Sequence, residues 1–258
     1  MELLVAYQND PAGHNMAKFI SQSMEKDGEL YHGKFFDLVM IPTPTISADW
    51  LEEKFHYDGF IFLSKHAAES GVLALTCHST GNFSEAKFGG KERQVAIPHP
   101  HIQKKYLQTL WENRDDFSDF QITIEATHHG PTDLNKPALF IEIGTTENQW
   151  NDTKLCDSIA KIVSDVLSKE TKTHPVAICF GETHYPEKFT KELLEGELAL
   201  GTVIPKHALD FLDEDLFSHI LERNNIAKTA LLDWDGMGAN KQKVLDLLDK
   251  TNLEIIKL

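Results

Sequence analysis

Two adjacent histidines, His128 and His129, stand in a stretch with the residue types for metal or acid–base chemistry, Glu125-Ala-Thr-His-His-Gly-Pro131. The stretch follows an apolar run that indicates a strand, and its Gly-Pro pair marks a place where the backbone bends. Further along, Glu142 lies inside the apolar run 139–143, which is typical of a buried strand. An ionised carboxylate there is costly unless it is paired or binds a metal. Imidazoles and carboxylates are typical zinc ligands, so the sequence predicts a metal or catalytic site. The alternative is that the two histidines cap a loop and Glu142 pairs with a lysine.

Five of the thirteen histidines share one position, since each follows an apolar strand-like run and precedes a glycine or proline turn: His66, His78, His128, His129 and His184. The carboxyl ends of strands in an open α/β sheet lie along one edge, so we expect these imidazoles to converge there. Taken singly, each is also compatible with a hydrogen-bonded loop histidine.

The segment His66-Ala-Ala-Glu69 has the His-x-x-Glu spacing used by zinc carboxypeptidases. Residues three apart on a helix share a face, so we expect His66 and Glu69 to reach one ion, with His78 as a third ligand. The four-residue pattern is also common by chance.

Two carboxylates, Glu125 and Glu142, could supply a further ligand and a general base. A zinc-bound water with a pKa of about 7, together with a carboxylate that takes its proton, is sufficient to hydrolyse an ester. Asn82, Thr183 and His184 could orient the substrate or stabilise an oxyanion.

Composition excludes several classes of protein. The chain of 258 residues is 41% hydrophobic, which fits a globular protein with a sizeable core, and it has no apolar run near the roughly 20 residues that span a bilayer. Cys77, Cys156 and Cys179 lie far apart, which argues against a disulfide framework and a thiolate zinc site and suits the reducing cytoplasm. No P-loop, G-x-G-x-x-G or G-x-S-x-G motif is present, so nucleotide hydrolysis, dinucleotide redox and serine-hydrolase chemistry lack support.

The formal net charge of -15 points away from nucleic acid, but the charge is uneven. Between residues 86 and 106, one acid faces five basic residues: Lys87, Lys91, Arg93, Lys104 and Lys105. This stretch could bind phosphates, although a solvated loop and helix face is the alternative.

The elements that must position these residues follow from hydrophobic periodicity and turn signals. Strands are predicted at 2–7, 34–41, 59–63, 72–77, 120–124, 138–143, 176–180, 198–204, 229–234 and 254–257. Helices are predicted at 15–25, 47–55, 102–113, 147–169, 189–194, 214–223 and 241–250. Asn9 or Asp10 could cap the first of these helices, with Pro11 inside its first turn. This pattern predicts a single α/β domain over residues 1–258, with a mixed sheet flanked by helices on both faces.

Together, these residues resemble the zinc-dependent D-aminoacyl-tRNA deacylases of the archaeal and plant type. The matching stretches span nearly the whole chain in order: Asn9-Asp-Pro-Ala-Gly13, Ser64-Lys-His-Ala-Ala-Glu-Ser-Gly71, Leu75-Thr-Cys-His78, Gly81-Asn82, Gly89-Gly90, Glu125-Ala-Thr-His-His-Gly-Pro131, Phe140-Ile-Glu-Ile-Gly144, Trp150, Gly181-Glu-Thr-His-Tyr185 and Leu232-Asp-Trp234. Three positions depart from the family pattern, because Glu182 replaces a second glycine, Thr202 a histidine and Asp235 a lysine. These departures bear on the role of the last third of the chain.

The resemblance implies a phosphorylase/hydrolase-like fold with a core similar to that of peptidyl-tRNA hydrolase. It also implies hydrolysis of the ester between a D-amino acid and tRNA, which keeps D-residues out of translation, and it implies bound zinc, with room for two ions. We expect no membrane or DNA partner, and we favour a monomer.

Four groups of site residues are expected on these grounds. The metal ligands are His66, Glu69, His78, His128, His129 and Glu142. The catalytic residues are Glu125, His128, His129, Glu142 and His184. Substrate is positioned by Asn9, Asn82 and Thr183, and tRNA phosphates are bound by Lys87, Lys91, Arg93, Lys104 and Lys105.

Two other functions compete with this one. The first is a zinc-dependent amidohydrolase or peptidase that acts on a small substrate through His66 and Glu69, which the acidic surface suits better. The second is a non-enzymatic RNA-binding or scaffolding module with a structural metal. A structural zinc site uses protein ligands, often cysteine, at all four positions, so an open coordination position would exclude that module.

Overall fold

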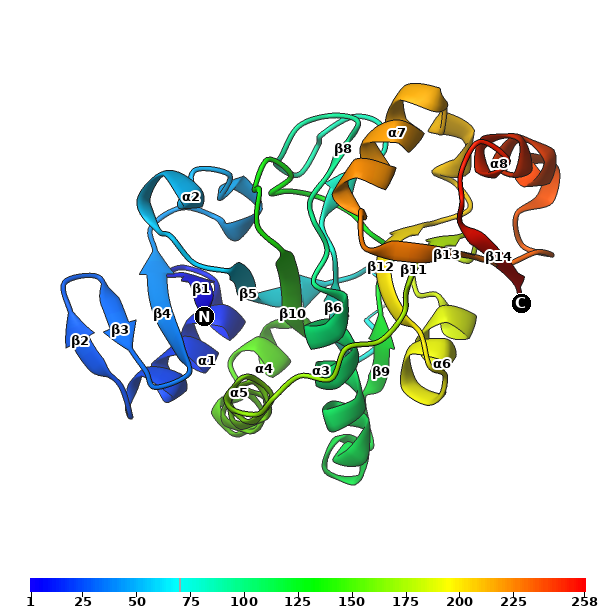
Figure 1. The fold of residues 1–258 in the computed structure, drawn as a ribbon. Coiled ribbons are helices and arrows are strands. Elements are labelled where there is room, and N and C mark those ends of the chain that lie inside the picture. The colour runs from blue at the N-terminus through cyan, green and yellow to red at the C-terminus, as the bar shows by residue number, and fades with distance from the viewer. Residues whose placement is uncertain (70) are drawn as a thin grey trace.

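The largest sheet in the computed structural model is a mixed sheet of eight strands (Figure 1). The structure describes residues 1–69 and 71–258. In spatial order the strands are β2 (Glu25–Asp27), β3 (Leu30–His32), β4 (Phe36–Ile41), β1 (Glu2–Tyr7), β5 (Gly59–Ala67), β10 (Ala138–Thr145), β6 (Ala74–His78) and β9 (Gln121–Ile124). Strands β4, β1, β5 and β10 are parallel, whereas β6 runs antiparallel to β10 and carries β9 parallel to itself. The predicted α/β class with a mixed sheet is confirmed.

Helices cover both faces of this sheet. One face packs against α1 (Pro11–Ser21), α3 (Pro100–Glu112), α4 (Glu147–Trp150) and α5 (Thr153–Ser168), which lie below the sheet in Figure 1. The 3-10 turn η1 (Thr45–Ser47) and α2 (Leu51–Lys54) pack on the other face. Because side chains alternate along a strand, Ile141 and Ile143 of β10 pack in the core between the sheet and these four helices, whereas Phe140 and Glu142 point to the opposite face.

A second, parallel sheet lies beside the first and was not predicted as separate. Its strands are β12 (Ala199–Ile204), β11 (Val176–Phe180), β13 (Ala227–Leu232) and β14 (Glu254–Lys257). It is accompanied by α6 (Glu187–Glu195), η3 (Leu209–Phe211), α7 (Glu214–Arg223), η4 (Gly238–Asn240) and α8 (Lys241–Leu248). Helices α7 and α8 pack on it through an apolar core of their own, which includes Phe180, Phe217 and Val244. A short ribbon, β7 (Gly81–Asn82) with β8 (Gln94–Val95), and the 3-10 turn η2 (Arg114–Phe117) complete the described elements.

Local capping explains two boundaries that differ from the predictions. The predicted cap of the first helix is confirmed, because the Asp10 carboxylate accepts a hydrogen bond from the Gly13 amide at 2.8 Å. Helix α1 therefore begins at Pro11, ahead of the apolar pattern that starts at residue 15. The predicted helix 147–169 is two helices, because Asp152 caps a new start at Thr153 by accepting from the amides of Lys154 and Leu155. The break leaves the Trp150 indole free to donate to the backbone carbonyl of His66 at 3.0 Å.

Strand β5 is longer than predicted, and this extension matters for the site. The apolar run ends at Leu63, but the strand continues to Ala67 because β10 pairs with it along the whole length, with Gly144 opposite His66. Among the described residues, no helix has both the length and the apolar character needed to span a bilayer.

Candidate active site

The predicted site residues gather on the face of the large sheet that is turned away from α1, α3 and α5. Glu142 of β10 has Ser64 of β5 on one side and Thr76 of β6 on the other, and all three are buried. His78, the last residue of β6, stands opposite Phe140 in the middle of β10 because β6 is antiparallel. The expectation that carboxyl strand ends gather these residues along one sheet edge is therefore wrong, and the site forms on a sheet face instead.

A glycine opposite His66 makes room for its imidazole. A Cβ atom added at Gly144 would lie 2.7 Å from Cδ2 of His66, which is closer than real contacts allow. A side chain at Gly144 would therefore push the imidazole away from the carboxylates described next.

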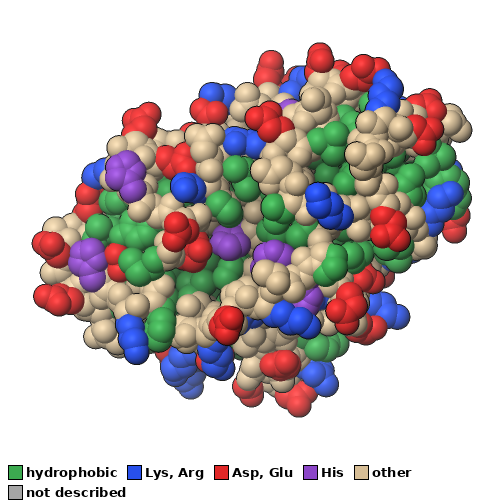
Figure 2. Space-filling model, in the orientation of Figure 1, with side chains coloured by type: hydrophobic (Ala, Val, Ile, Leu, Met, Phe, Trp, Pro, Cys, Tyr) green, Lys and Arg blue, Asp and Glu red, His purple; other side chains and the backbone are tan. Residues whose placement is uncertain are grey.

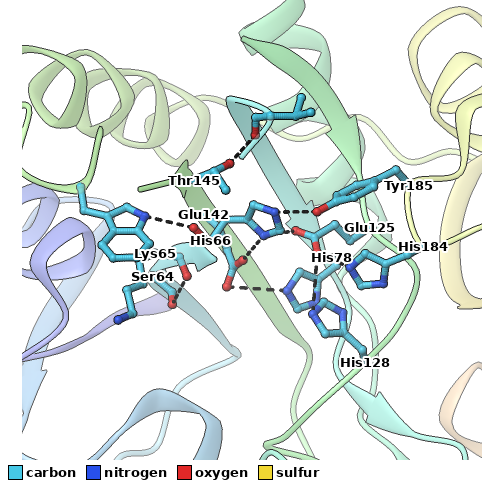
Figure 3. Close-up of polar contacts among 12 residues, drawn as sticks. Ser64, Lys65, His66, His78, Glu125, His128, Glu142, Thr145, His184 and Tyr185 are labelled. Carbon is cyan, nitrogen blue, oxygen red and sulfur yellow. Dashed lines mark hydrogen bonds and ion pairs between the residues drawn. The ribbon is translucent and has the colours of Figure 1, made fainter. Parts of the chain in front are cut away.

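His66 lies between two buried carboxylates (Figure 3). Its Nδ1 atom lies 3.1 Å from Oε1 of Glu125 and 3.3 Å from Oε2 of Glu142, and its Nε2 atom lies 2.7 Å from the hydroxyl of Tyr185. Burial alone would lower the pKa of His66, but the two carboxylates outweigh it and raise the pKa to about 10. His66 is therefore an imidazolium that donates from both nitrogens, and Tyr185 accepts one of these hydrogen bonds.

Glu125 also bonds to a histidine from the second sheet. It follows β9, and its Oε2 atom accepts from Nε2 of His184 at 2.8 Å, with His128 Nε2 3.7 Å away. His184 follows β11, and its loop is fixed because the Ala126 amide donates to the His184 carbonyl at 2.8 Å. Burial would raise the pKa of Glu125, but the hydrogen bonds from His184 and His66 hold it well below its usual range. The site therefore forms where the two sheets meet.

Three imidazoles form a cluster beside Glu125 and His184: those of His78, His128 and His129. The Nδ1 atom of each lies near a backbone carbonyl, at 3.1 Å from Ser79, 2.9 Å from Ala126 and 2.7 Å from Gly130. Donation from Nδ1 leaves a lone pair on Nε2 of His128 and of His129. Burial alone would lower the pKa of His78, but the carboxylates of Glu142 and Glu125 raise it. Burial, followed by the neighbouring His78, lowers the pKa of His128 well below its usual range and that of His129 to about 4, so both are neutral at pH 7.

These residues fit a zinc ion. The described residues include three groups whose ligand atoms lie within 4.8 Å of one another: His78 with His128 and His129, Glu125 with His128 and His184, and His66 with Glu125 and Glu142. In the first group the buried Nε2 atom of His78 has no hydrogen-bond partner among the described residues and lies 3.8 Å from Oε1 of Glu142. Three imidazole nitrogens oriented through their other nitrogen form a donor set typical of catalytic zinc.

A cavity of about 610 Å³ opens onto the cluster. Its lining includes the polar residues His66, Glu125, Glu142, His184 and Tyr185 and the apolar residues Ile46 and Phe88. Histidine side chains near the centre of the face in Figure 2 have hydrophobic side chains beside them. The lining of the cavity therefore combines polar, titratable groups with apolar side chains, as in ligand sites.

Seven of the predicted residues meet here, but Glu69 does not. His66, His78, Glu125, His128, His129, Glu142 and His184 share the site. Glu69 is exposed in the turn after β5. The prediction of a helical His66–Glu69 pair is wrong, because His66 lies on a strand.

The expected substrate-positioning residues have other contacts. Asn9 and Thr183 are exposed, and their side chains donate to the Tyr7 hydroxyl and the Tyr185 carbonyl. Asn82 is buried and donates to the carbonyls of Gly89 and Lys91 at 2.9 and 3.2 Å, so it fastens a loop. None of the three is in the lining of the 610 Å³ cavity as formed by the described residues.

Two of the five predicted phosphate-binding residues, Lys104 and Lys105, contact backbone carbonyls instead. The buried Lys104 ammonium donates to the carbonyls of Leu193, Gly196 and Leu198 at 2.7 to 3.0 Å. Lys105 donates to the carbonyls of Val166 and Lys169 at the end of α5. Both amines therefore hold helices and turns together rather than face solvent.

The other three basic residues are exposed, but each already has an acidic partner. Lys87 pairs with Glu85 at 3.3 Å, Lys91 with Asp133 at 2.5 Å and Arg93 with Asp213 at 2.6 Å. Such surface pairs are weak, so these residues remain available to other anions.

Tyr185 and Asp10 are two of the cavity residues that were not predicted as site residues. Tyr185 follows His184 directly in the chain and lines the same cavity. Its position next to a predicted site histidine is the feature of the sequence that could have identified it. Asp10 was expected only to cap a helix, but its second oxygen also accepts from the Lys65 amide at 3.1 Å and it lines the cavity. The departure from the family pattern at Thr202 lies in the buried strand β12, where its hydroxyl accepts from the Asn224 amide at 2.8 Å.

Comparison with known proteins agrees with this geometry. Residues 53–256 match the family model described as D-aminoacyl-tRNA deacylase. Over 256 residues, the chain is 56% identical to the D-aminoacyl-tRNA deacylase of Cenarchaeum symbiosum, with 99% of each chain covered. It is 33% identical over 263 residues to the protein of that name from Thermoplasma acidophilum, with 100% of each covered. A solved crystal structure of a conserved protein of unknown function superposes with a TM-score of 0.92 at 28% identity, over 100% of this chain and 95% of that one. The chain belongs to the D-aminoacyl-tRNA deacylase family.

Proposed function

We propose that this protein hydrolyses the ester that joins a D-amino acid to the terminal ribose of tRNA. Relatives over the full length carry the name of this activity. The observation that carries the proposal is the pair of Glu125 and His184 beside Tyr185 on the wall of a cavity of about 610 Å³. An ester carbonyl in this cavity would meet both a base and a hydrogen-bond donor.

His184 is the proposed general base. Its Nε2–H donates to the buried Glu125 carboxylate, which leaves Nδ1 with a lone pair, and the ring is 40% exposed. A carboxylate that holds an imidazole in one tautomer is the arrangement used by many hydrolases to activate a nucleophile. In this role Nδ1 of His184 accepts a proton from the attacking water.

Tyr185 is the proposed donor to the oxyanion. Its oxygen accepts from the His66 imidazolium, so its own O–H is free to donate into the cavity. Burial, with Glu125 and Glu142 nearby, raises the pKa of Tyr185 to about 12, so the hydroxyl keeps its proton at pH 7. A hydrogen bond from a cationic chain of His66 and Tyr185 would stabilise the negative charge that develops on the carbonyl oxygen.

The proton balance closes within these residues. Water adds to the ester carbon while His184 takes its proton, and the tetrahedral species then collapses with cleavage of the bond to the ribose oxygen. The His184 imidazolium returns its proton to that oxygen, which gives free D-amino acid and tRNA. The reaction would remove mischarged D-residues before translation.

His78, His128 and His129 are the residues we propose to hold zinc. When bound, zinc would act as a Lewis acid toward the ester carbonyl. Glu142 would complement the positive charge of the cluster, because its Oε1 atom lies 3.8 Å from Nε2 of His78. A second ion beside Glu125 would need His66 and His184 to give up the protons that they donate to its carboxylate, so we propose a single ion.

The proposed substrate implies work in the cytoplasm, where aminoacyl-tRNA is used. The three cysteines are buried and free, which agrees with a reducing compartment. We propose that the chain acts as a monomer. The rival amidohydrolase loses its main support, because the His66–Glu69 pair does not form.

The direct test is release of D-tyrosine from D-Tyr-tRNA by the purified protein, with L-Tyr-tRNA as the control substrate. We expect release from the D-substrate, slow or no release from the L-substrate, and loss of activity with a chelator that added zinc reverses. Failure to release D-tyrosine in the presence of zinc would end the proposal. Activity that survives complete removal of metal would end only the zinc part.

A further inference from the structure

A second cavity adjoins the first and is not used by the reaction as described. Its volume is about 290 Å³, and it shares Phe88, His128 and His129 with the lining of the larger cavity. The two cavities therefore lie next to each other at the histidine cluster.

Two exposed phenyl rings distinguish this second cavity. Phe88 is 68% exposed, the largest fraction among the exposed large hydrophobic side chains of the described residues, and Phe211 is 46% exposed. Both rings line the second cavity, together with His207 and Lys87. Single exposed apolar residues need no explanation, but two aromatic rings at one hollow beside a reactive site indicate a binding surface.

The backbone that carries Phe88 is held in place. The Gly130 amide donates to the Phe88 carbonyl at 3.0 Å, and Asn82 bonds to the carbonyl of Gly89. Gly89 has a φ of 75°, and a Cβ there would lie 1.9 Å from the carbonyl oxygen of Ile46, so only glycine allows this close packing. The backbone that carries the exposed ring is therefore held in place next to the histidine cluster.

The second ring is tied to the same loop. Nη1 of Arg93 donates to the Phe211 carbonyl at 3.2 Å. Nη2 of the same residue lies 2.6 and 2.7 Å from the two carboxylate oxygens of Asp213. The segments of both rings are thus connected, and a flat ligand would meet a preorganised surface.

The chemistry of the substrate identifies the occupant. The amino acid is esterified to the ribose of the last nucleotide of tRNA, and that end of tRNA is single-stranded. Unpaired bases stack on exposed aromatic side chains, and cationic groups beside them meet the phosphates. We propose that the second cavity binds the 3′-terminal nucleotide of tRNA, with its base stacked on Phe88 and Phe211. This inference rests on the proposed function, since it places the nucleotide next to the scissile ester.

A site for a single terminal nucleotide is also compatible with the acidic net charge, which by itself points away from nucleic acid. Recognition of one terminal nucleotide needs few phosphate contacts, so a net charge of -15 does not prevent it. Binding that involves few phosphates also depends only weakly on salt.

The first test measures stacking without hydrolysis. An uncharged oligonucleotide of the acceptor end, with fluorescent 2-aminopurine as its last base, is titrated with the protein. We expect quenching by the wild-type protein, reduced at least tenfold in apparent affinity by Phe211→Ala, which leaves the lining of the larger cavity unchanged. Phe35→Ala is the matched control because Phe35 is also 46% exposed and lines neither cavity. Absence of quenching by the wild type, or equal affinity of wild type and Phe211→Ala, would overturn the inference.

The second test compares D-Tyr-tRNA with D-tyrosine methyl ester, which has no nucleotide. We expect Phe88→Ala and Phe211→Ala to raise KM for D-Tyr-tRNA about tenfold, while kcat/KM of Phe211→Ala for the methyl ester stays within twofold of wild type. Phe88→Trp keeps a stacking surface and should restore a KM near that of wild type. Equal loss on both substrates in Phe211→Ala would contradict the nucleotide site, whereas a wild-type enzyme inactive on D-Tyr-tRNA would contradict the proposed function itself.

Discussion

Nε2 of His184 donates a hydrogen bond to Oε2 of Glu125 at 2.8 Å, although the two residues are 59 positions apart and follow strands of different sheets. The carboxylate is buried and the imidazole faces the cavity. A contact of this kind fixes both the tautomer and the direction of the ring. In the mechanism that we propose, catalysis therefore depends on the relative position of the two sheets.

Replacing the carboxylate tests this relationship. We expect Glu125→Gln to lower kcat for D-Tyr-tRNA about 100-fold or more, because general-base catalysis contributes about 10² to 10⁴ and the amide cannot stabilise the His184 imidazolium. Steady-state kinetics give the readout, with circular dichroism as the check on folding. Glu69→Gln, at an exposed carboxylate, should behave as wild type. Equal activity of the two variants would remove Glu125 from the mechanism.

Removing one hydroxyl tests the proposed oxyanion donor. Loss of such a donor typically costs about 10² to 10³ in kcat, so Tyr185→Phe should lower kcat by that factor and leave KM within about threefold. The variant keeps the aromatic ring that packs on His66. Single-turnover kinetics separate the chemical step from product release. A KM effect without a kcat effect would show that Tyr185 only binds the substrate.

Metal content tests the three-imidazole group. We expect at least one zinc ion per chain by elemental mass spectrometry after purification with zinc, and less than half of that in His129→Asn. Asparagine suits this position because His129 has a φ of 44°, and asparagine tolerates that region better than most residues. Zinc should also raise the melting temperature of the wild type, since a ligand that binds the folded state stabilises it. His56→Ala, at an exposed histidine, is the control; unchanged zinc content in His129→Asn would exclude this residue as a ligand.

Lys104 should be a stability residue and not a tRNA contact. Lys104→Met keeps the apolar stem but leaves three buried carbonyls without their donor, which should lower the free energy of unfolding by about 3 kcal/mol or more. Lys91→Met removes an exposed ion pair and should stay within about 0.5 kcal/mol of wild type. Urea unfolding measures both. If Lys104→Met unfolded like wild type but had a raised KM for tRNA, the phosphate-binding role first expected from the sequence would be correct.

Asp37 should make stability depend on acid. Burial would raise the pKa of Asp37, but hydrogen bonds from Tyr57 at 2.6 Å, from the Gly33 amide at 3.0 Å and from His32 at 2.9 Å hold it below the ordinary 3.8. A carboxyl with a lowered pKa stabilises the fold above its unfolded pKa, and this contribution is lost as the pH falls through the folded value.

The measurement for Asp37 is urea unfolding of wild type and Asp37→Asn at several pH values. We expect the variant to be about 2 kcal/mol less stable at pH 7, and the difference to shrink below pH about 4. Asp115→Asn, at an exposed site, should show no difference at any pH. A difference that is constant down to pH 2 would show that the charge of Asp37 is not responsible.

Local signals carried much of the fold. The strand 176–180, the helix 214–223 and the strand 254–257 have the same bounds in the structure as in the prediction. Hydrophobic periodicity and caps act within a few residues, so they can be read without the fold. The end of β5 could not be predicted in this way, because the strand continues past Leu63 to Ala67 through its pairing with β10 and not through an apolar pattern.

The sequence by itself determined the chemical identity of the site, since the histidines and the carboxylates Glu125 and Glu142 were recognisable from their types and their positions after apolar runs. Only the tertiary structure decided how they meet. An antiparallel β6 brings His78 to Glu142, and the junction of two sheets brings His184 to Glu125. It also decided that Lys104 is buried and that Tyr185 faces the cavity. Strand direction and the packing of distant segments depend on contacts between residues far apart in the chain, and no local pattern specifies these.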